Sequence, residues 1–364
     1  MDGMSHRERV LAALNHKEPD RVPIDLGSTW VSTIVESTHE SLKEYLGLEG
    51  GATESAMFVL QTVRVDERIQ KMFDTDIRPV VPGAPVNWER KIEEKGGYDY
   101  FEDDWGIGWR MPRKGGFYYD MVKHPLAGAD LQEIKSYRGP DISDPGRIAG
   151  LAERTRQMHE ETDYAIFPEI GGPGMFEGSW FLRGMEQFMV DMINDPESAA
   201  ALMDKLLEIS AGFYGLYLEE IVDYIDIVPM GDDLGGQRGP LMNPDMYRKL
   251  IKPRQKELIS FVKSKTKAKV FFHICGDATP FLDDLIEIGV DIINPVQVTA
   301  ANMDTKKLKE RWGDRLVFWG GGCDTQRILP FGTEDEVADE VRRRIDDLAP
   351  GGGFIFNQVH DIQA

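Results

Sequence analysis

The sequence predicts an α/β fold, a (β/α)₈ TIM barrel that forms a single domain over residues 1–364, with a β-hairpin insertion over the barrel mouth at about 86–121. From about residue 160 onward, apolar β-rich runs alternate with helices, which is the pattern of parallel βα units. Two weaker strands nearer the N-terminus bring the count to eight, enough to close a barrel. The expected strands are 22–27, 76–81, 164–170, 223–230, 268–274, 290–295, 316–320 and 353–359.

The helices between these strands are marked by residues that favour helix starts. Asp195 and Asn243 are each followed by proline, which suits the first helical position because it has no N–H to leave unpaired. Thr333 and Glu336 have the spacing of a capping box, in which each side chain bonds the other residue's backbone N–H. These local signals support the alternation of strands and helices.

The stretch 86–121 departs from this rhythm and predicts a β-hairpin insertion. Two interpretations remain open: a small satellite core, or a cover over the mouth of the barrel. It is rich in glycine and in aromatic side chains, namely Trp88, Tyr98, Tyr100, Trp105, Trp109, Phe117 and Tyr118.

Composition excludes several classes of partner. The chain has 364 residues, 41% of them hydrophobic, and no apolar run near the ~20 residues that a membrane span requires. Its formal net charge of −21 disfavours nucleic acid and anionic membrane surfaces. The N-terminal segment reads as an amphipathic helix with a capping box at Ser5 and Glu8 rather than as a secretory signal, so we expect a cytoplasmic protein whose partners are small molecules or other proteins.

Polar residues that could do chemistry fall where the predicted strands end. In a parallel barrel these ends form one face, the face on which active sites lie. Distant parts of the sequence are therefore expected to meet there. The candidates are Glu169, Asp232, Asp233, His273, Cys275, Gln297, Cys323 and His360.

His273, Cys275 and Cys323 are the predicted metal ligands. Residues two apart on a strand project to the same side, so His273 and Cys275 can bind one ion together. Cys323 follows a later strand in a glycine-rich turn, and imidazole with two thiolates suits zinc, with a fourth position open for catalysis. Core packing of two small thiols, or a closed structural zinc site, are the alternatives.

The remaining candidates are assigned by their place at strand ends. Glu169, Asp232 and His360 are predicted to be catalytic, and Asp233 and Gln297 to contribute to cofactor binding. Each has a simpler alternative: the adjacent aspartates can form a loop turn that satisfies its own backbone, and His360 can be a core histidine.

At these residues the chain resembles the uroporphyrinogen decarboxylase superfamily, in its cobalamin-dependent methyltransferase branch. The resemblance spans nearly the whole chain. It is carried by SHRERVLAALNHKEPDRVPID, GDDLGGQRGPLMNPDMYRKLIKPR, HICGDATPFLDDLIEIGVDIINPVQV, VFWGGGCDTQRILPFGT and VHDIQ.

The resemblance implies a (β/α)₈ barrel and a zinc site, because the methylcobalamin:coenzyme M methyltransferases of that branch carry a His-X-Cys pair and a distant Cys as ligands. It also implies a corrinoid (cobalamin) cofactor. Since the predicted single barrel has no room for it, we expect a separate corrinoid protein as partner. The methyl group would pass between that protein and a small-molecule thiol, methyl ether or alcohol, in a direction that the sequence does not choose.

Two other functions stay open. The decarboxylase branch uses an arginine-rich segment near its first strand to bind a porphyrinogen, whereas this chain has DLGSTW at 25–30. Without that arginine cluster the many substrate carboxylates would lack partners. The other alternative is a non-catalytic, zinc-stapled barrel that serves as a platform for a partner.

Overall fold

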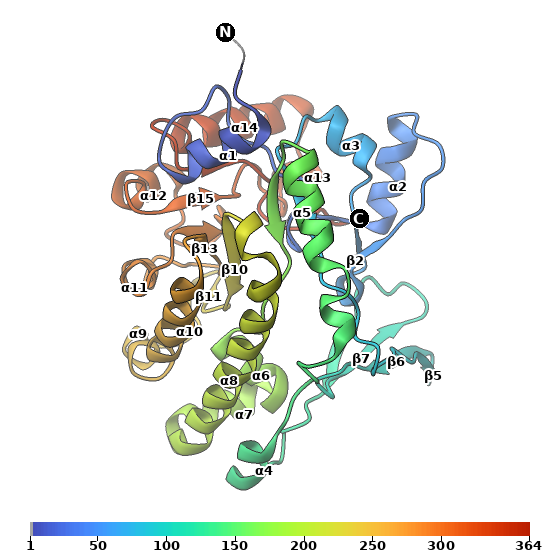
Figure 1. The fold of residues 1–364 in the computed structure, drawn as a ribbon, viewed down its shortest axis with the longest axis vertical. Helices are drawn as coiled ribbons and strands as arrows, with labels where there is room; N and C mark the ends of the chain where they lie inside the picture. Colours follow the sequence, from blue (N-terminus) through green and yellow to red (C-terminus); the bar gives the residue numbers. More distant parts are fainter. Residues whose placement is uncertain (1–2) are drawn as a thin grey trace.

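The computed structural model describes residues 3–364 and shows an α/β fold built around parallel strands (Figure 1). Five strands form one sheet in the order β10-β13-β14-β15-β16, and β4 pairs with β9 in parallel. A single bridge at Ile24 joins Phe356, and the Ile24 carbonyl accepts the amide of Asp76, so this segment connects the two sheets. The parallel strands are β4 (Ile77–Val80), β9 (Ala165–Pro168), β10 (Ile227–Gly231), β13 (Lys269–His273), β14 (Ile292–Asn294), β15 (Val317–Trp319) and β16 (Phe354–Ile355).

All eight expected strand regions thus take part, seven as strands and one as a bridge, but the ring is not closed. Within residues 3–364 no ladder joins β9 to β10. The expected strand 223–230 also begins later, at Ile227, because a 3₁₀ turn at Val222–Tyr224 (η3) prolongs the preceding helix. The parallel α/β architecture is confirmed, and a closed barrel is not.

A hydrophobic cluster fills the interior of the ring. Phe271 of β13 makes edge-to-face contacts with Phe167 of β9 at 5.1 Å and Trp319 of β15 at 5.3 Å between ring centroids. The buried Trp319 Nε1 donates to Asp25 Oδ2 at 2.9 Å, which satisfies its N–H away from water. Helix α1 (His6–Leu14) closes the amino-terminal end of the ring. The cluster comprises Val10, Ala13, Leu14, Ile77, Ala165, Phe167, Ile227, Phe271, Ile292, Val317, Trp319 and Ile355.

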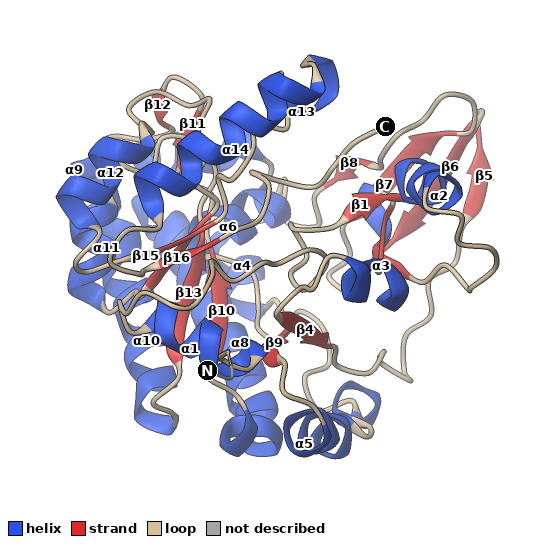
Figure 2. Ribbon diagram, turned by 90° about the horizontal axis from the view of Figure 1, so that it is seen from above, coloured by secondary structure: helices blue, strands red, loops and turns tan. Residues whose placement is uncertain are grey.

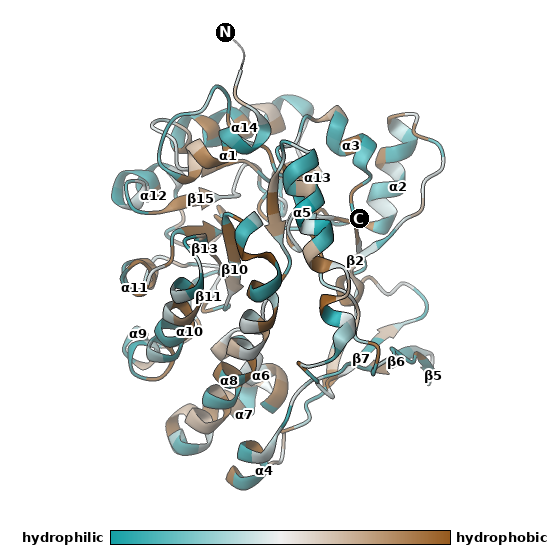
Figure 3. Ribbon diagram, in the orientation of Figure 1, coloured by the Kyte–Doolittle hydropathy of each residue, from teal (hydrophilic) through white to brown (hydrophobic). Residues whose placement is uncertain are grey.

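Helices surround the strands (Figure 2), and the central parallel strands such as β10 are hydrophobic whereas many of the helices carry hydrophilic stretches (Figure 3). The predicted caps are present: the side chain of Asp195 accepts from the amide of Ser198, and Thr333 with Glu336 forms a capping box. No helix within residues 3–364 is long and apolar enough to span a membrane. The longer helices are α5 (Leu151–Glu161), α6 (Met175–Arg183), α7 (Met185–Asn194), α8 (Pro196–Ile221), α10 (Lys252–Lys265), α12 (Thr305–Trp312) and α14 (Glu334–Leu348).

Shorter elements connect these units. The small antiparallel sheet β1-β3-β2 packs beside the ring, and β11 pairs with β12 in a hairpin. The elements are β1 (Ile34–Val35), α2 (Glu36–Tyr45), β2 (Ser55–Met57), η1 (Phe58–Leu60), β3 (Thr62–Val63), α3 (Glu67–Met72), α4 (Leu131–Ser136), η2 (Pro145–Ile148), β11 (Gly235–Gly236), β12 (Gly239–Pro240), α9 (Pro244–Met246), the π-helical turn η4 (Tyr247–Ile251), α11 (Leu282–Ile288) and α13 (Ile328–Phe331).

The region expected to be a hairpin forms a four-stranded antiparallel sheet at one side of the molecule (Figure 2). The rings of Phe58, Phe101 and Tyr119 lie 5.2–5.5 Å apart and give it a satellite core. That this sheet also covers the mouth of the ring stays a prediction. Its strands are β5 (Glu93–Lys95), β6 (Tyr98–Glu102), β7 (Gly108–Pro112) and β8 (Asp120–Lys123).

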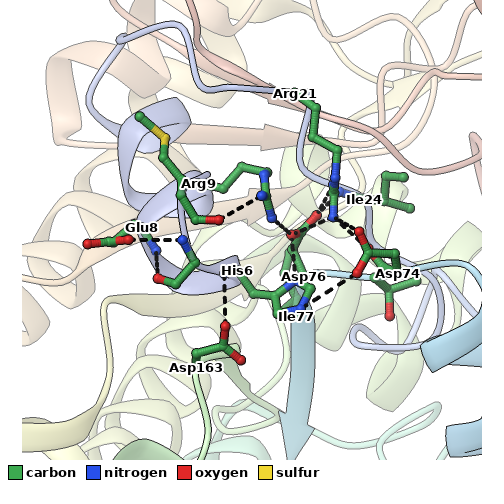
Figure 4. Close-up of polar contacts among 12 residues, drawn as sticks. His6, Glu8, Arg9, Arg21, Ile24, Asp74, Asp76, Ile77 and Asp163 are labelled. Carbon is green, nitrogen blue, oxygen red and sulfur yellow. Dashed lines mark hydrogen bonds and ion pairs between the residues drawn. The ribbon is translucent and has the colours of Figure 1, made fainter. Parts of the chain in front are cut away.

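A buried carboxylate ties α1 and the segment after it to β4 (Figure 4). Asp76 accepts from Arg9 at 2.6 Å, from Arg21 at 2.6 Å, from the amide of Ile24 at 2.7 Å, and lies 2.9 Å from His6 Nδ1. Its side chain is 0% exposed. Because a buried charge is costly unless it is paired, this carboxylate and its basic partners depend on one another.

We predict that Asp76→Asn lowers the free energy of unfolding by about 3 kcal/mol, because it leaves Arg9 and Arg21 without the buried charge they share. Asp74→Asn is the matched control: Asp74 also pairs with Arg21, but its side chain is 66% exposed. Its loss should cost less than about 1 kcal/mol. Urea denaturation of both variants gives the comparison, and equal losses would contradict the role of Asp76.

Candidate functional site

The parallel register brings three residues into one row at the carboxyl ends of the strands. Gly231 of β10 lies opposite His273 of β13, which in turn lies opposite Asn294 of β14. Gly231 makes room for the imidazole, since a Cβ there would lie only 3.0 Å from the Cβ of His273. His273 therefore has a residue without a side chain, Gly231, on one side and the side-chain amide of Asn294 on the other.

Asn294 sets the orientation and the tautomer of His273. Its Nδ2 donates to the carbonyl of Trp319 at 3.0 Å, which leaves its Oδ1 facing His273 Nδ1 at 2.8 Å. An oxygen at that position requires the proton on Nδ1, so Nε2 carries a free lone pair. The imidazole is thus presented as a ligand toward the space above the strand ends.

Cys275 and His360 share that space with His273. One ligand atom from each of the three residues lies within 4.8 Å of the other two. The Cys275 sulfur is 3.4 Å from His273 Nε2, and the rings of His273 and His360 meet edge to face at 5.9 Å. Imidazole and thiolate groups at such separations are the donor set of a zinc or similar transition-metal site with a position left open.

Carboxylates surround this cluster. Asp233 Oδ1 is 3.8 Å from His273 Nε2 and accepts the Cys275 amide at 2.7 Å. The buried Asp361 binds Thr33 through Oδ1, whereas its Oδ2, 3.4 Å from His360 Nδ1, has no hydrogen-bond partner among residues 3–364. Such an unpaired buried oxygen is costly unless a cation lies nearby.

The electrostatics follow from burial and these charges. Burial, Asp233 and Glu177 raise the pKa of the Cys275 thiol well above its usual range. Burial, followed by Asp233 and Asp232, raises the pKa of Glu177 well above its usual value. Burial lowers the pKa of His273, so its imidazole is neutral. A bound cation would compensate the carboxylates and stabilise the thiolate, so the donor set fits a metal ion.

Cys323 lies apart from this cluster. Its buried thiol is 4.0 Å from the carbonyl of Asp324, and burial, together with Glu340 and Asp324, raises its pKa to about 11. The thiol is not one of the three ligand groups that lie within 4.8 Å of one another in the described residues. The chain turns sharply before it, with φ of +106° at Gly320 and +77° at Gly321. His360 thus takes the place in the described cluster that the sequence assigned to Cys323, whose role as a zinc ligand stays a prediction.

Asp232, predicted to be catalytic, caps a helix. Its carboxylate accepts from the amides of Phe176 and Glu177 at the start of α6 and from Gln255 Nε2 at 2.9 Å. Burial raises its pKa to about 6 against the effect of these three donors. Gly174 must lack a side chain, because a Cβ there would lie 2.5 Å from this carboxylate. In this structure Asp232 therefore fixes the backbone at the start of α6.

The other predicted residues also have structural partners. Both oxygens of Glu169, at the end of β9, bind Arg64 at 2.5 and 2.6 Å. Gln297 Oε1 accepts the amide of Gly276 at 2.6 Å and so braces the turn that follows Cys275. Asp233, by holding the Cys275 amide, does the same from the other side. The catalytic role of Glu169 and the cofactor role of Gln297 stay predictions.

Sequence reasoning missed three residues of the site. Asn294 ends an apolar strand, the signal that selected Glu169, and could have been found in the same way. Asp361 follows His360 directly and lies in the same predicted strand-end region. Glu177 gave no such signal, because it lies in the first turn of α6 and reaches the cluster only through the fold.

A ring of parallel strands with a His/Cys cluster and carboxylates at its carboxyl ends defines a barrel-type α/β protein with its site where such folds carry catalytic residues. The chain belongs to the uroporphyrinogen decarboxylase (URO-D) family, whose model matches residues 103–364. Its fold is similar to that of a methyltransferase from Methanosarcina mazei, with a TM-score of 0.60 and 18% identity over 99% of this chain and 94% of that chain. None of the curated proteins matches the sequence significantly.

We predict that His360→Ala removes most of the zinc from protein that otherwise holds about one ion per chain, because it deletes one of three ligands. Cys323→Ser separates the two candidate ligand sets: zinc that is retained assigns the ion to the three clustered residues, and zinc that is lost assigns Cys323 to the site as the sequence predicts. Metal analysis after dialysis checks this, with circular dichroism as the control for folding. The reverse result would establish Cys323 as the ligand.

Zinc affinity should rise with pH across the neutral range, by about tenfold per pH unit, because binding must release the proton of Cys275. The sign follows from the raised pKa of that thiol, while the lowered pKa of His273 means that this imidazole has no proton to release. Competition with a chelator at several pH values measures the slope. A flat profile would contradict thiolate ligation.

Proposed function

We propose that this chain is a zinc-dependent methyltransferase that moves a methyl group between a corrinoid protein and a small thiol or a methyl ether or alcohol. The observation that carries the proposal is the cluster of His273, Cys275 and His360 at the strand ends. Family membership and the fold shared with a methyltransferase support it.

His273, Cys275 and His360 would hold the zinc ion, with a fourth position open. The ion would supply Lewis acidity, which promotes ionisation of a bound thiol or polarises the oxygen of a methyl ether or alcohol. Asn294 fixes the ring of His273, and Asp233 fixes the backbone of Cys275. The ligands are thereby held before substrate arrives, which lowers the cost of ordering the site.

The carboxylates have a separate role. A thiol or alcohol that binds in the open position gives up or shares a proton, which needs an acceptor. The Oδ2 of Asp361, which has no hydrogen-bond partner among residues 3–364 and lies 3.4 Å from His360 Nδ1, provides a candidate acceptor beside the cluster.

The ligand set bears on the direction of transfer. Two imidazoles and one thiolate leave more positive charge on zinc than one imidazole and two thiolates. This supports polarisation of a methyl ether or alcohol, whereas the likeness to zinc thiol methyltransferases in sequence supports the thiol direction. A corrinoid protein would present its cofactor at the strand-end face in either case.

Decarboxylation of a porphyrinogen is the second candidate, because the family bears that name. Such a substrate carries many carboxylates and needs a cationic pocket. Here the carboxylates of Asp233 and Asp361 lie beside the cluster, and Arg64 is already paired with Glu169. The charges therefore favour methyl transfer.

Spectroscopy of cobalamin tests the proposal. With methylcobalamin and a panel of thiols, a thiol methyltransferase should consume the methyl-cobalt absorbance. With cob(I)alamin and a panel of methoxylated compounds, a demethylating enzyme should build that absorbance up. Either activity should be lost on chelation and in Cys275→Ser, and chelated protein should recover with zinc.

Inactivity in both directions, with zinc bound and a matched corrinoid protein present, would favour the zinc-stapled platform. Formation of coproporphyrinogen from uroporphyrinogen that survives chelation would favour the decarboxylase.

A further inference from the structure

A second cavity, of about 370 Å³, lies between the antiparallel sheet and the helices of the ring. The loop between β6 and β7 forms one wall, α6 and α8 form another, and Arg147 of η2 and the turn at 171–173 complete it. None of the residues of the metal-type cluster lines it. The cavity is thus a separate feature, and its walls join the two parts of the fold.

Five aromatic residues line this cavity. The rings of Trp105 and Phe213 lie 6.4 Å apart, and Phe213 stacks on Tyr217 at 6.0 Å. Trp109 from β7 and Phe181 from α6 complete the set. The faces of aromatic rings carry partial negative charge, so such a lining attracts cations.

The charged residues of the lining carry a net charge of −1. Arg147 Nη2 pairs with Asp104 at 2.6 Å, and its guanidinium lies over the ring of Phe213 at 5.1 Å, so one face of that ring is already occupied. Asp103 remains, and no basic group within residues 3–364 forms an ion pair with it. Burial and the neighbouring Asp104 raise the pKa of Asp103, and hydrogen bonds from Trp109, Ile107 and Trp105 oppose this shift.

The acceptor capacity of Asp103 is largely used inside the protein. Its Oδ1 accepts the amides of Trp105 at 3.0 Å and Ile107 at 2.9 Å, and its Oδ2 accepts Trp109 Nε1 at 2.8 Å. The cavity thus offers negative charge and aromatic rings, and the acceptors of Asp103 are already in use. A primary ammonium brings three N–H donors that each need an acceptor, whereas a quaternary ammonium has none to satisfy.

We propose that this cavity binds a quaternary ammonium compound, whose diffuse charge faces the aromatic rings and the carboxylate of Asp103. The net negative charge of the lining would repel an anion and would contribute no attraction to a neutral ligand. The proposal stands on the lining of the cavity alone and does not depend on zinc or on methyl transfer.

Isothermal titration calorimetry of the full chain tests the proposal with tetramethylammonium and choline as ligands. Two controls separate the physical causes: 3,3-dimethylbutan-1-ol, the neutral isostere of choline, and ethanolamine, its primary amine. We expect saturable binding of choline and at least roughly tenfold weaker binding of both controls, because the isostere lacks the positive charge and the primary amine carries N–H donors that need acceptors.

Variants locate the site. Trp105→Leu should weaken choline binding by about tenfold through the lost ring, and Asp103→Asn should weaken it through the lost charge. Trp88→Leu is the matched control, since Trp88 lies in the same part of the chain but does not line the cavity. Circular dichroism verifies that each variant folds.

Three results would overturn the proposal. They are the absence of saturable binding, binding of either control compound as tightly as choline, and choline binding that Trp105→Leu and Asp103→Asn leave unchanged.

Discussion

The parallel hydrogen-bond register of β10, β13 and β14 is the constraint on which the site depends. It sets Gly231, His273 and Asn294 side by side. Because side chains alternate between the two faces of a strand, a slip by one residue would turn His273 outward and separate it from Asn294. The aromatic packing of Phe167, Phe271 and Trp319 inside the ring opposes such a slip. The geometry of the site therefore depends on the packing of the core.

Buried carboxylates at the two ends of the ring differ in whether they are paired with basic groups. At the amino-terminal end, Asp76 is fully paired with Arg9, Arg21 and His6, and serves stability. At the carboxyl end, Asp361 keeps an unpaired oxygen. Since uncompensated buried charge lowers stability, its presence at one end only suits a site that binds a cation there. The same contrast recurs in the side cavity, where Asp103 is saturated with N–H donors but lacks a cation.

Several predicted catalytic residues turn out to hold others in place. Asp232 caps α6, while Gln297 and Asp233 brace the turn around Cys275 from two sides. Residues at strand ends are recognised in sequence by their position. Whether such a residue meets a ligand or a backbone amide depends on the loop that packs over it.

The alternation of strands and helices, the caps, and the pairing of His273 with Cys275 could be predicted from the sequence, because each depends on residues within a few positions of one another. The sequence also selects His360 by its strand-end position, but as a catalytic residue rather than as a ligand. Its nearness to His273 and Cys275 arises from the packing of the last strand-end segment against β13. Glu177, the four strands of the inserted sheet and the aromatic cavity likewise arise from packing between segments far apart in the chain, which no local pattern encodes.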